Sequence, residues 1–377
     1  MRLNEEQVLL RDTARAFARN ELMPHAAEWD RDARFPGEAV AKLGRLGFLG
    51  MLVPPEYGGG GADHVGYALA IEEIAAGDGA TSTIVAVNSL CCGVVQQYGS
   101  EEQKRRFLVP MAQGDMLAAF CLTEPQAGSD AAAIKTRARR RGNGWVLNGT
   151  KQFITSGSTA KVAIVFAVTD PDAGRKGISA FIVPTDRPGY RVARLEKKLG
   201  QRASDTAQIM FEEMELEPEL MLGQEGDGYR IALANLEGGR IGIAAQAVGM
   251  ARAAYEAALA YAKERESFGQ KLIAHQAVAF RLADMATQLA AAYGLVLEAA
   301  ERRDRGEPAL KAAAMAKLFA SETAERVASD AIQIHGGYGY VADFPVERIY
   351  RDVRVCQIYE GASDIQRLLI AREIARD

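Results

Sequence analysis

The periodicity of the apolar residues changes twice along the chain, and this change constrains the fold more than any other feature. Up to about residue 115, apolar residues such as Leu10, Ala14 and Phe17 recur at helical spacing after a capping-box start at Asn4. The middle of the chain instead holds short β-rich runs separated by Gly, Pro, Asn and Asp. Long helical patterns return after Asp227. The sequence therefore predicts a helical region, a β region and a second helical region, in that order.

No helical segment separates the β-rich runs, so they predict a small antiparallel sheet rather than parallel βαβ units. The runs are Trp145–Asn148, Val162–Val168, Ile178–Val183 and Gln208–Phe211. Helical patterns with a break at Arg305–Pro308 predict a four-helix bundle in the last third. The expected fold is an α+β multidomain one. Its expected domains are residues 1–117 (helical), 118–226 (β) and 227–377 (bundle).

Composition and charge exclude several classes of protein. The 377 residues are 48% hydrophobic and 25% charged, which is ordinary globular composition for a chain of two or three domains. A net charge of −4 does not favour nucleic acid or an anionic membrane as a partner. The basic run from Lys135 to Arg141 lacks interleaved aromatics, so we interpret it as a solvated strand face. The four cysteines lack CxxC spacing, which predicts reduced thiols and no metal site.

The first residues, Met1 to Gln7, contain no apolar stretch, so the sequence predicts neither a secretory signal nor a transit peptide. No run of 18 apolar residues occurs, and we therefore expect no membrane insertion. Both observations favour a cytoplasmic location.

One short segment, Ile358–Gln366, has the composition of a catalytic loop. It places Glu360 between Tyr359, which can exclude water, and Gly361, which lets a ligand approach the backbone. A carboxylate kept from water has a raised pKa and becomes a usable general base near neutral pH. Taken alone, the segment fits a solvated surface glutamate better than a catalytic one.

Other segments combine turn residues, hydroxyls and aromatics in a way that suits a bulky cofactor. They are Phe120–Asp130, Asn148–Gly157 and Gln333–Tyr340. Each could be a plain turn when considered singly. No GxGxxG follows a predicted strand, so a Rossmann dinucleotide site is not supported.

Taken together, these segments resemble a known family. FCLTEPQAGSD, LNGTKQFITSG, KERESFGQ, QIHGGYGY and IYEGASDIQ are similar, in order and spacing, to motifs of the acyl-CoA dehydrogenases, and the resemblance covers essentially the whole chain. It implies FAD-dependent α,β-dehydrogenation of an acyl-CoA thioester to the trans-2-enoyl-CoA. Glu360 would remove the α-proton, flavin N5 would take the β-hydride, and an electron-transfer flavoprotein would accept the electrons.

The resemblance also implies the residues of the site. A developing enolate needs hydrogen-bond donors at the carbonyl oxygen, and in the family these are a flavin hydroxyl and the backbone N–H of the base, here Glu360. The segments matching those that line the flavin contain Cys121, Leu122, Thr123, Gly128, Ser129, Phe153, Ile154 and Thr155. The residues expected near the FAD of a neighbouring subunit are Arg265, Phe268, Gln276, Gln333, Gly336 and Gly337. Further FAD contacts are expected from Ala362, Ser363 and Asp364. The expected substrate-binding residues are Ser129, Glu237, Arg240, Tyr359 and Gly361.

Three positions bear on how far the resemblance extends. The family often has Trp at Phe153 and Thr at Ala362, so an indole N–H and a hydroxyl contact are lost here. Some members carry the base directly before the Arg of the substrate helix, where this chain has Gly239, so Glu360 has no rival. A site completed by a neighbouring subunit implies an oligomer, and the family habit is a homotetramer.

The sequence leaves the acyl chain open, with side chains near Thr81–Ser89 expected to set the depth of the pocket. An acyl-CoA oxidase is one alternative, although the chain lacks a large C-terminal extension. A non-catalytic or DNA-associated member of the same fold is another, and the retained Glu360 speaks against it.

Overall fold

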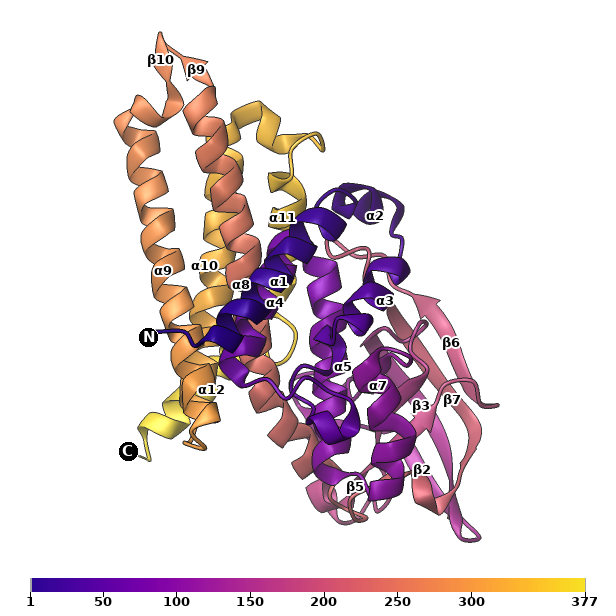
Figure 1. Cartoon of the computed structure of the whole chain (residues 1–377). Helices are drawn as coiled ribbons and strands as arrows, with labels where there is room; N and C mark the ends of the chain where they lie inside the picture. Colours follow the sequence, from indigo (N-terminus) through magenta and orange to yellow (C-terminus); the bar gives the residue numbers. More distant parts are fainter. Residues whose placement is uncertain (1, 377) are drawn as a thin grey trace.

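A computed structural model describes residues 2–376 of the chain. Its N-terminal helices lie between a bundle of long helices on one side and a β-sheet on the other (Figure 1). One hydrophobic core joins these helices to the bundle, and a second joins them to the sheet. The order of helical, β and helical regions is the one that the sequence predicts.

In the N-terminal region, the capping box predicted at Asn4 is confirmed, with Gln7 as its partner, and a second one, of Ser100 with Gln103, begins α6 (Glu101–Gln103). The helices of this region are α1 Glu5–Phe17, α2 Ala26–Asp32, α3 Gly37–Arg45, α4 His64–Gly77, α5 Gly79–Tyr98, α6 and α7 Val109–Gln113. Asp78 separates α4 from α5 because its backbone is extended and its side chain caps α5. Among the described residues, only α5 is long and apolar enough to cross a membrane. Of its most apolar 18-residue stretch, 83% is buried inside the fold.

The middle region is a single eight-stranded sheet in the order β6-β7-β3-β2-β4-β5-β8, with β1 beside β4. The strands are β1 Ala118–Cys121, β2 Arg137–Arg141, β3 Gly144–Thr155, β4 Val162–Val168, β5 Ile178–Pro184, β6 Tyr190–Leu195, β7 Thr206–Leu216 and β8 Met221–Leu222. All four expected runs are strands, and the pairing is antiparallel except between β1 and β4 and at one contact between β2 and β4. In β2, Arg137 and Arg139 are exposed while Ala138 is buried, which fits a solvated strand face.

The C-terminal region consists of three long helices followed by two shorter ones. They are α8 Gly228–Glu264, α9 Gln276–Asp304, α10 Leu310–His335, α11 Val346–Val353 and α12 Ser363–Ile374. The predicted break at Arg305–Pro308 separates α9 from α10. A small hairpin, β9 Glu266–Ser267 with β10 Gln270–Lys271, stands at the end of the bundle far from the sheet (Figure 1).

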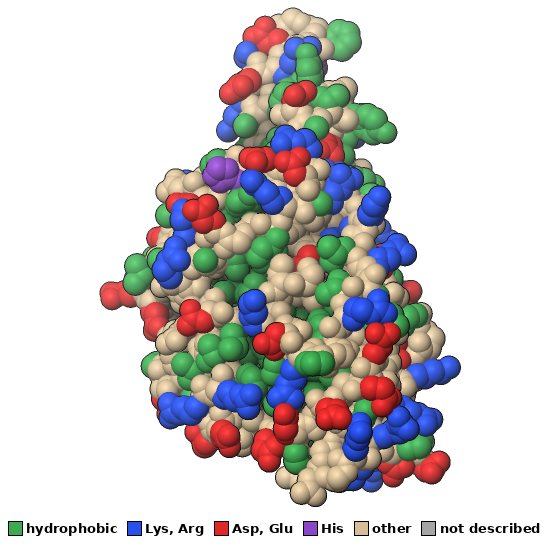
Figure 2. Space-filling model, turned by 90° about the vertical axis from the view of Figure 1, so that its right-hand side faces the viewer, with side chains coloured by type: hydrophobic (Ala, Val, Ile, Leu, Met, Phe, Trp, Pro, Cys, Tyr) green, Lys and Arg blue, Asp and Glu red, His purple; other side chains and the backbone are tan. Residues whose placement is uncertain are grey.

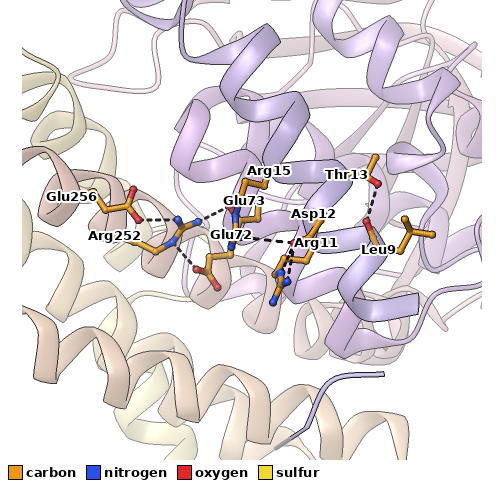
Figure 3. Close-up of polar contacts among 9 residues, drawn as sticks. All are labelled: Leu9, Arg11, Asp12, Thr13, Arg15, Glu72, Glu73, Arg252 and Glu256. Atoms are coloured by element: carbon orange, nitrogen blue, oxygen red, sulfur yellow. Dashed lines mark hydrogen bonds and ion pairs between the residues drawn. The ribbon is translucent and has the colours of Figure 1, made fainter. Parts of the chain in front are cut away.

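An ion-pair network joins the N-terminal helices to the bundle (Figure 3). Arg252 of α8 donates to Glu72 at 2.9 Å and to Glu73 at 2.8 Å, and both carboxylates lie on α4. Arg15 of α1 donates to Glu73 at 2.7 Å. These pairs are largely buried, so they fix how α4 packs on α8, the helix that carries Gly239 and Arg240.

Candidate active site

Two side chains of the C-terminal helices fix the segment that carries Glu360 by hydrogen bonds to its backbone. The Lys317 ammonium, on α10, donates to the Tyr359 carbonyl at 2.9 Å and to the Gly361 carbonyl at 2.6 Å. The Gln366 amide, on α12, donates to the Gly361 carbonyl at 2.7 Å and to the Glu360 carbonyl at 3.4 Å. These bonds hold Glu360 at φ +50° and Gly361 at φ +92°, a left-handed conformation that is unusual for a non-glycine residue.

The Glu360 carboxylate is shielded from water and lies near two cations. Its Oε2 atom is buried and makes no hydrogen bond within residues 2–376. Burial raises the pKa of Glu360 to about 7, although Lys317 and Arg240 favour the ionised form. A Cβ atom at Gly239 would collide with Oε2, so glycine at that position makes room for the carboxylate. Arg240 is also buried, and its Nε and Nη1 atoms have no partner among the described residues.

A cluster of polar side chains lies beside this segment. The Tyr359 hydroxyl donates to Gln246 of α8 and accepts from the Gln201 amide at 3.4 Å. Gln246 also donates to Thr83 of α5 at 2.6 Å, and Thr83 donates to Gln201 at 2.5 Å. We call Thr83, Gln201, Gln246 and Tyr359 the polar cluster. It ties the N-terminal helices, the loop before β7 and the bundle to the segment that carries Glu360.

Two segments that are predicted to face the flavin are joined by a buried ion pair. Lys151 donates to the Glu124 carboxylate at 2.8 Å and to the Leu122 carbonyl at 3.0 Å, and the Gln152 N–H donates to the Thr123 carbonyl at 2.8 Å. Burial alone would raise the pKa of Glu124, but Lys151 and several hydrogen bonds hold it at about 2. The segments after β1 and at the end of β3 therefore form one rigid surface.

The side chains on this surface are only partly those expected. Phe153 is 63% exposed at φ +59°, where a register shift between β3 and β7 turns it out of the sheet. Leu122, Thr123, Gly128, Ser129 and Thr155 are partly or fully exposed. Cys121 and Ile154 point into the core, so only their backbones can face a cofactor. An exposed flat aromatic beside exposed backbone and hydroxyls fits one end of an isoalloxazine ring.

The start of α12 lies directly after Glu360 and also has unused donors. Ala362 is the N-cap residue and offers no side-chain cap, and the Ser363 Oγ atom is buried without a partner among the described residues. Asp364 is exposed. A helix N-terminus without a cap, beside an unpaired hydroxyl, fits a bound group that carries hydrogen-bond acceptors.

A second group of predicted residues lies at the tip of the bundle. It consists of Arg265, Phe268, Gln276, Gln333, Gly336 and Gly337, and all are exposed. Phe268 is 95% exposed, and the Arg265 guanidinium lies 5.9 Å from the Tyr338 ring centre. The tip stands clear of the rest of the molecule and shows exposed hydrophobic side chains (Figure 2). Because β9 and β10 lie far from the sheet, the tip and the Phe153 surface of one chain do not form one site (Figure 1).

The expected substrate residues other than Ser129 lie on α8 or in the segment that carries Glu360. Arg240 lies near the carboxylate, and Tyr359 and Gly361 flank it in the chain. Glu237 accepts a hydrogen bond from Arg303 at 3.2 Å. Ser129 lies on the sheet side, in the loop after β1.

Five residues around the site were not predicted from the sequence: Lys317, Gln366, Gln201, Gln246 and Arg303. A lysine or glutamine within the alanine-rich stretches of α8 and α10 could have indicated Lys317 and Gln246. Burying such a polar side chain in an apolar core is costly, so its presence there suggests a specific partner.

Comparison with known proteins covers the whole chain. Three family models match: acyl-CoA dehydrogenase N-terminal domain at residues 4–115, middle domain at 119–214 and C-terminal domain at 226–375. An acyl-CoA dehydrogenase of Bacillus subtilis is 48% identical over 99% of this chain and 98% of its own length. The short-chain specific, mitochondrial acyl-CoA dehydrogenase of Homo sapiens is 48% identical over 99% of this chain and 91% of its own length.

Solved structures give the same result. Butyryl-CoA dehydrogenase from Megasphaera elsdenii has a TM-score of 0.98 and 40% identity, with full coverage of both chains. A chain from a study of the electron transferring flavoprotein of Acidaminococcus fermentans has a TM-score of 0.99 and 44% identity, again with full coverage of both chains.

Proposed function

Because the chain belongs to the acyl-CoA dehydrogenase family and is an oxidoreductase, we propose that it converts a short-chain acyl-CoA to the trans-2-enoyl-CoA. The single observation that carries the proposal is the Glu360 carboxylate. Its Oε2 atom is buried, its pKa is raised to about 7, and it lies on a segment that Lys317 and Gln366 hold in place. These are the properties that a general base needs at neutral pH.

In the proposed reaction, Glu360 accepts the α-proton of the thioester. The other acidic residue near the substrate helix, Glu237, is bonded to Arg303, and Gly239 has no side chain, so neither competes with Glu360. As the proton leaves, negative charge develops on the thioester oxygen, and the Glu360 backbone N–H is the donor that we assign to it. Arg240 would bind the substrate from α8.

The exposed surface around Phe153 and the start of α12 would hold FAD. Leu122, Thr123 and Thr155 offer backbone and hydroxyl groups there, while Ser363 offers an unpaired hydroxyl. Bound FAD supplies the acceptor for the two electrons that leave with the β-hydrogen. Where the family often has Trp, Phe153 still offers a flat face for stacking. Where the family often has Thr, Ala362 has no hydroxyl, so Ser363 and the N–H groups of the helix remain as donors.

The two separate groups of FAD-contacting residues support a shared site. In our proposal, the tip of one subunit, with Arg265 and Gln276, meets the adenosine half of the FAD held by a neighbour. A homotetramer is the proposed assembly. The structural likeness to a chain studied with an electron transferring flavoprotein supports such a flavoprotein as the electron acceptor. A cytoplasmic location stays a prediction, as do domain boundaries at residues 117 and 226.

A short acyl chain is supported by the polar cluster as well as by the relatives. Short-chain specific dehydrogenases and butyryl-CoA dehydrogenase are among the similar proteins. Hydrogen bonds join Gln246 to Thr83 and Tyr359 beside Glu360. A long apolar acyl chain inserted between these side chains would leave buried polar groups unpaired. Tyr67 also fills space between α4 and α8, since a Cβ atom at Gly242 would lie 2.7 Å from its hydroxyl.

Anaerobic titration of the FAD-loaded protein with butyryl-, hexanoyl- and octanoyl-CoA tests this proposal. We expect butyryl-CoA to bleach the flavin fastest and octanoyl-CoA slowest. Faster bleaching by octanoyl-CoA would show that the chain-length assignment is wrong. If none of a wider set of acyl-CoAs bleaches the flavin, the proposed reaction itself is wrong.

A further inference from the structure

We propose that Lys317 is a positioning residue that aims the Glu360 backbone N–H at the thioester oxygen. The inference rests on the proposed function, because it concerns the donor that stabilises the developing enolate. It assigns a task to a side chain of α10 that the sequence motifs around Glu360 do not contain.

Lys317 is fully buried, with 0% of its surface exposed. A buried ammonium is costly unless its hydrogen bonds are satisfied, and buried lysines usually face a carboxylate. Within residues 2–376, the hydrogen bonds of Lys317 instead go to two backbone carbonyls, those of Tyr359 and Gly361, at 2.9 and 2.6 Å. The ammonium is therefore used to orient the backbone on both sides of Glu360.

The direction of one carbonyl fixes the direction of the next N–H. In a planar trans peptide, the C=O of residue i and the N–H of residue i+1 point in opposite directions. The Tyr359 carbonyl points at Lys317, so the Glu360 N–H points away from Lys317. That N–H makes no hydrogen bond to any residue in the described range, which leaves it available for a ligand oxygen.

Gln366 cannot replace Lys317 in this task. Its amide reaches the carbonyls of Glu360 and Gly361, at 3.4 and 2.7 Å, but not that of Tyr359. Among the described residues, Lys317 alone bonds the Tyr359 carbonyl. Since Glu360 has φ +50°, the Tyr359–Glu360 peptide is in a conformation that a non-glycine residue adopts only when its surroundings hold it.

Lys317 could also act simply as a positive charge near the Glu360 carboxylate, and the two roles make different predictions. A charge acts on the carboxylate and requires only the ammonium. Orientation acts on the peptide and requires a hydrogen-bond donor, charged or neutral. Lys317→Gln removes the charge and keeps a donor, whereas Lys317→Met removes both at similar length.

The test measures the carbonyl stretch of crotonyl-CoA bound to the FAD-loaded protein, by isotope-edited difference infrared spectroscopy. The rate of flavin reduction by butyryl-CoA is measured on the same variants. Ser321→Ala serves as the matched control, because Ser321 is a buried polar residue one turn along α10 whose hydroxyl bonds Leu318 and not the Glu360 segment.

We expect wild type and Ser321→Ala to shift the carbonyl stretch to lower frequency than in free crotonyl-CoA. Lys317→Met should lose most of that shift, and flavin reduction should fall by roughly 10²-fold, as for loss of one oxyanion donor. Lys317→Gln should keep a clear part of the shift. If Lys317→Met does not fold, the shift in Lys317→Gln decides the matter.

The proposal is overturned if Lys317→Met binds crotonyl-CoA with the wild-type shift. It is equally overturned if Lys317→Gln loses the shift completely, because a hydrogen-bond donor at this position would then not orient the peptide. Failure of the proposed function has a different signature, since the wild-type flavin would then not be reduced by any acyl-CoA.

Discussion

At the scale of single residues, burial raises the pKa of Glu360 by more than its two neighbouring cations lower it. Its pKa is raised to about 7, so in the ligand-free enzyme the carboxylate is largely protonated at pH 5 and ionised at pH 9. We predict that the second-order rate constant for flavin reduction by butyryl-CoA rises with pH and levels off above about pH 7. Stopped-flow measurements between pH 5 and 9 check this. A rate already at its plateau at pH 5 would contradict a desolvated base.

Gly239 and Gly238 offer a matched pair of substitutions on α8. A Cβ atom at Gly239 would collide with Glu360 Oε2, whereas one at Gly238 would meet only the Arg303 side chain, at 3.5 Å. We predict that Gly239→Ala displaces the carboxylate and slows flavin reduction by roughly 10²-fold, with FAD still bound. Gly238→Ala should reduce its flavin at close to the wild-type rate. Equal rates in both variants would show that the carboxylate has room to move.

Glu360 could be predicted as a candidate base because the residues beside it in the chain, together with the family resemblance, point to it. Lys317 and Gln246 could not be assigned in the same way. Their partners are a backbone carbonyl 42 residues away and a tyrosine hydroxyl 113 residues away, and only the folded chain brings them together. A lysine within a helical pattern is normally a solvated residue, so its complete burial is information that the structure adds.

At the scale of elements, one buried ion pair holds together the two segments that form the Phe153 surface. Lys151→Met would leave Glu124 as an unpaired buried charge, for which the expected loss of stability is about 3–5 kcal/mol. The prediction is a lower melting temperature and weaker FAD retention. Arg191→Met is the control, since it breaks an exposed pair with Glu212 in the same sheet and should leave the melting temperature close to that of wild type. Similar melting temperatures for the two variants would contradict the account.

The long helices and the most apolar strands could be predicted from periodicity, but the edges of the sheet could not. Strand β6 is exposed and carries Arg191 and Arg194, so it lacks the apolar alternation of a strand. Strand β1 reads Ala-Ala-Phe-Cys, a run equally compatible with a helix. Strand β3 continues to Thr155 only because a bulge accommodates the left-handed Phe153, and a bulge depends on the partner strand.

At the scale of the whole molecule, the predicted FAD contacts fall into two places that one chain does not bring together. Arg265 lies on the exposed tip, far from the sheet that carries Phe153 (Figure 1). We predict that Arg265→Ala releases FAD more readily than wild type on dilution. Lys263→Ala, which removes a cation from the exposed end of α8, should retain FAD normally. Full FAD retention by a monomeric Arg265→Ala protein would contradict the shared site.

Composition and periodicity do not give that separation, and only the family resemblance predicts that Arg265 meets the FAD of a neighbouring subunit. The motifs are distributed along the chain without any sign of which ones meet, and distance along the chain does not give distance in space. The fold shows which groups one subunit can combine: Glu360 with Arg240 and Lys317, but not with Arg265. In our proposal, the remaining FAD contacts come from a neighbouring chain.

The most direct test of the account is anaerobic flavin reduction by butyryl-CoA in Glu360→Gln, compared with Glu237→Gln. Gln keeps the size and the backbone of Glu360 but cannot accept the α-proton, so FAD and acyl-CoA should still bind. A general base contributes about 10²–10⁴-fold, and Gly239 offers no substitute, so we predict a loss at the upper end of that range. Glu237→Gln should lose much less, because Glu237 is engaged by Arg303. Reduction of the Glu360→Gln flavin at close to the wild-type rate would show that Glu360 is not the base.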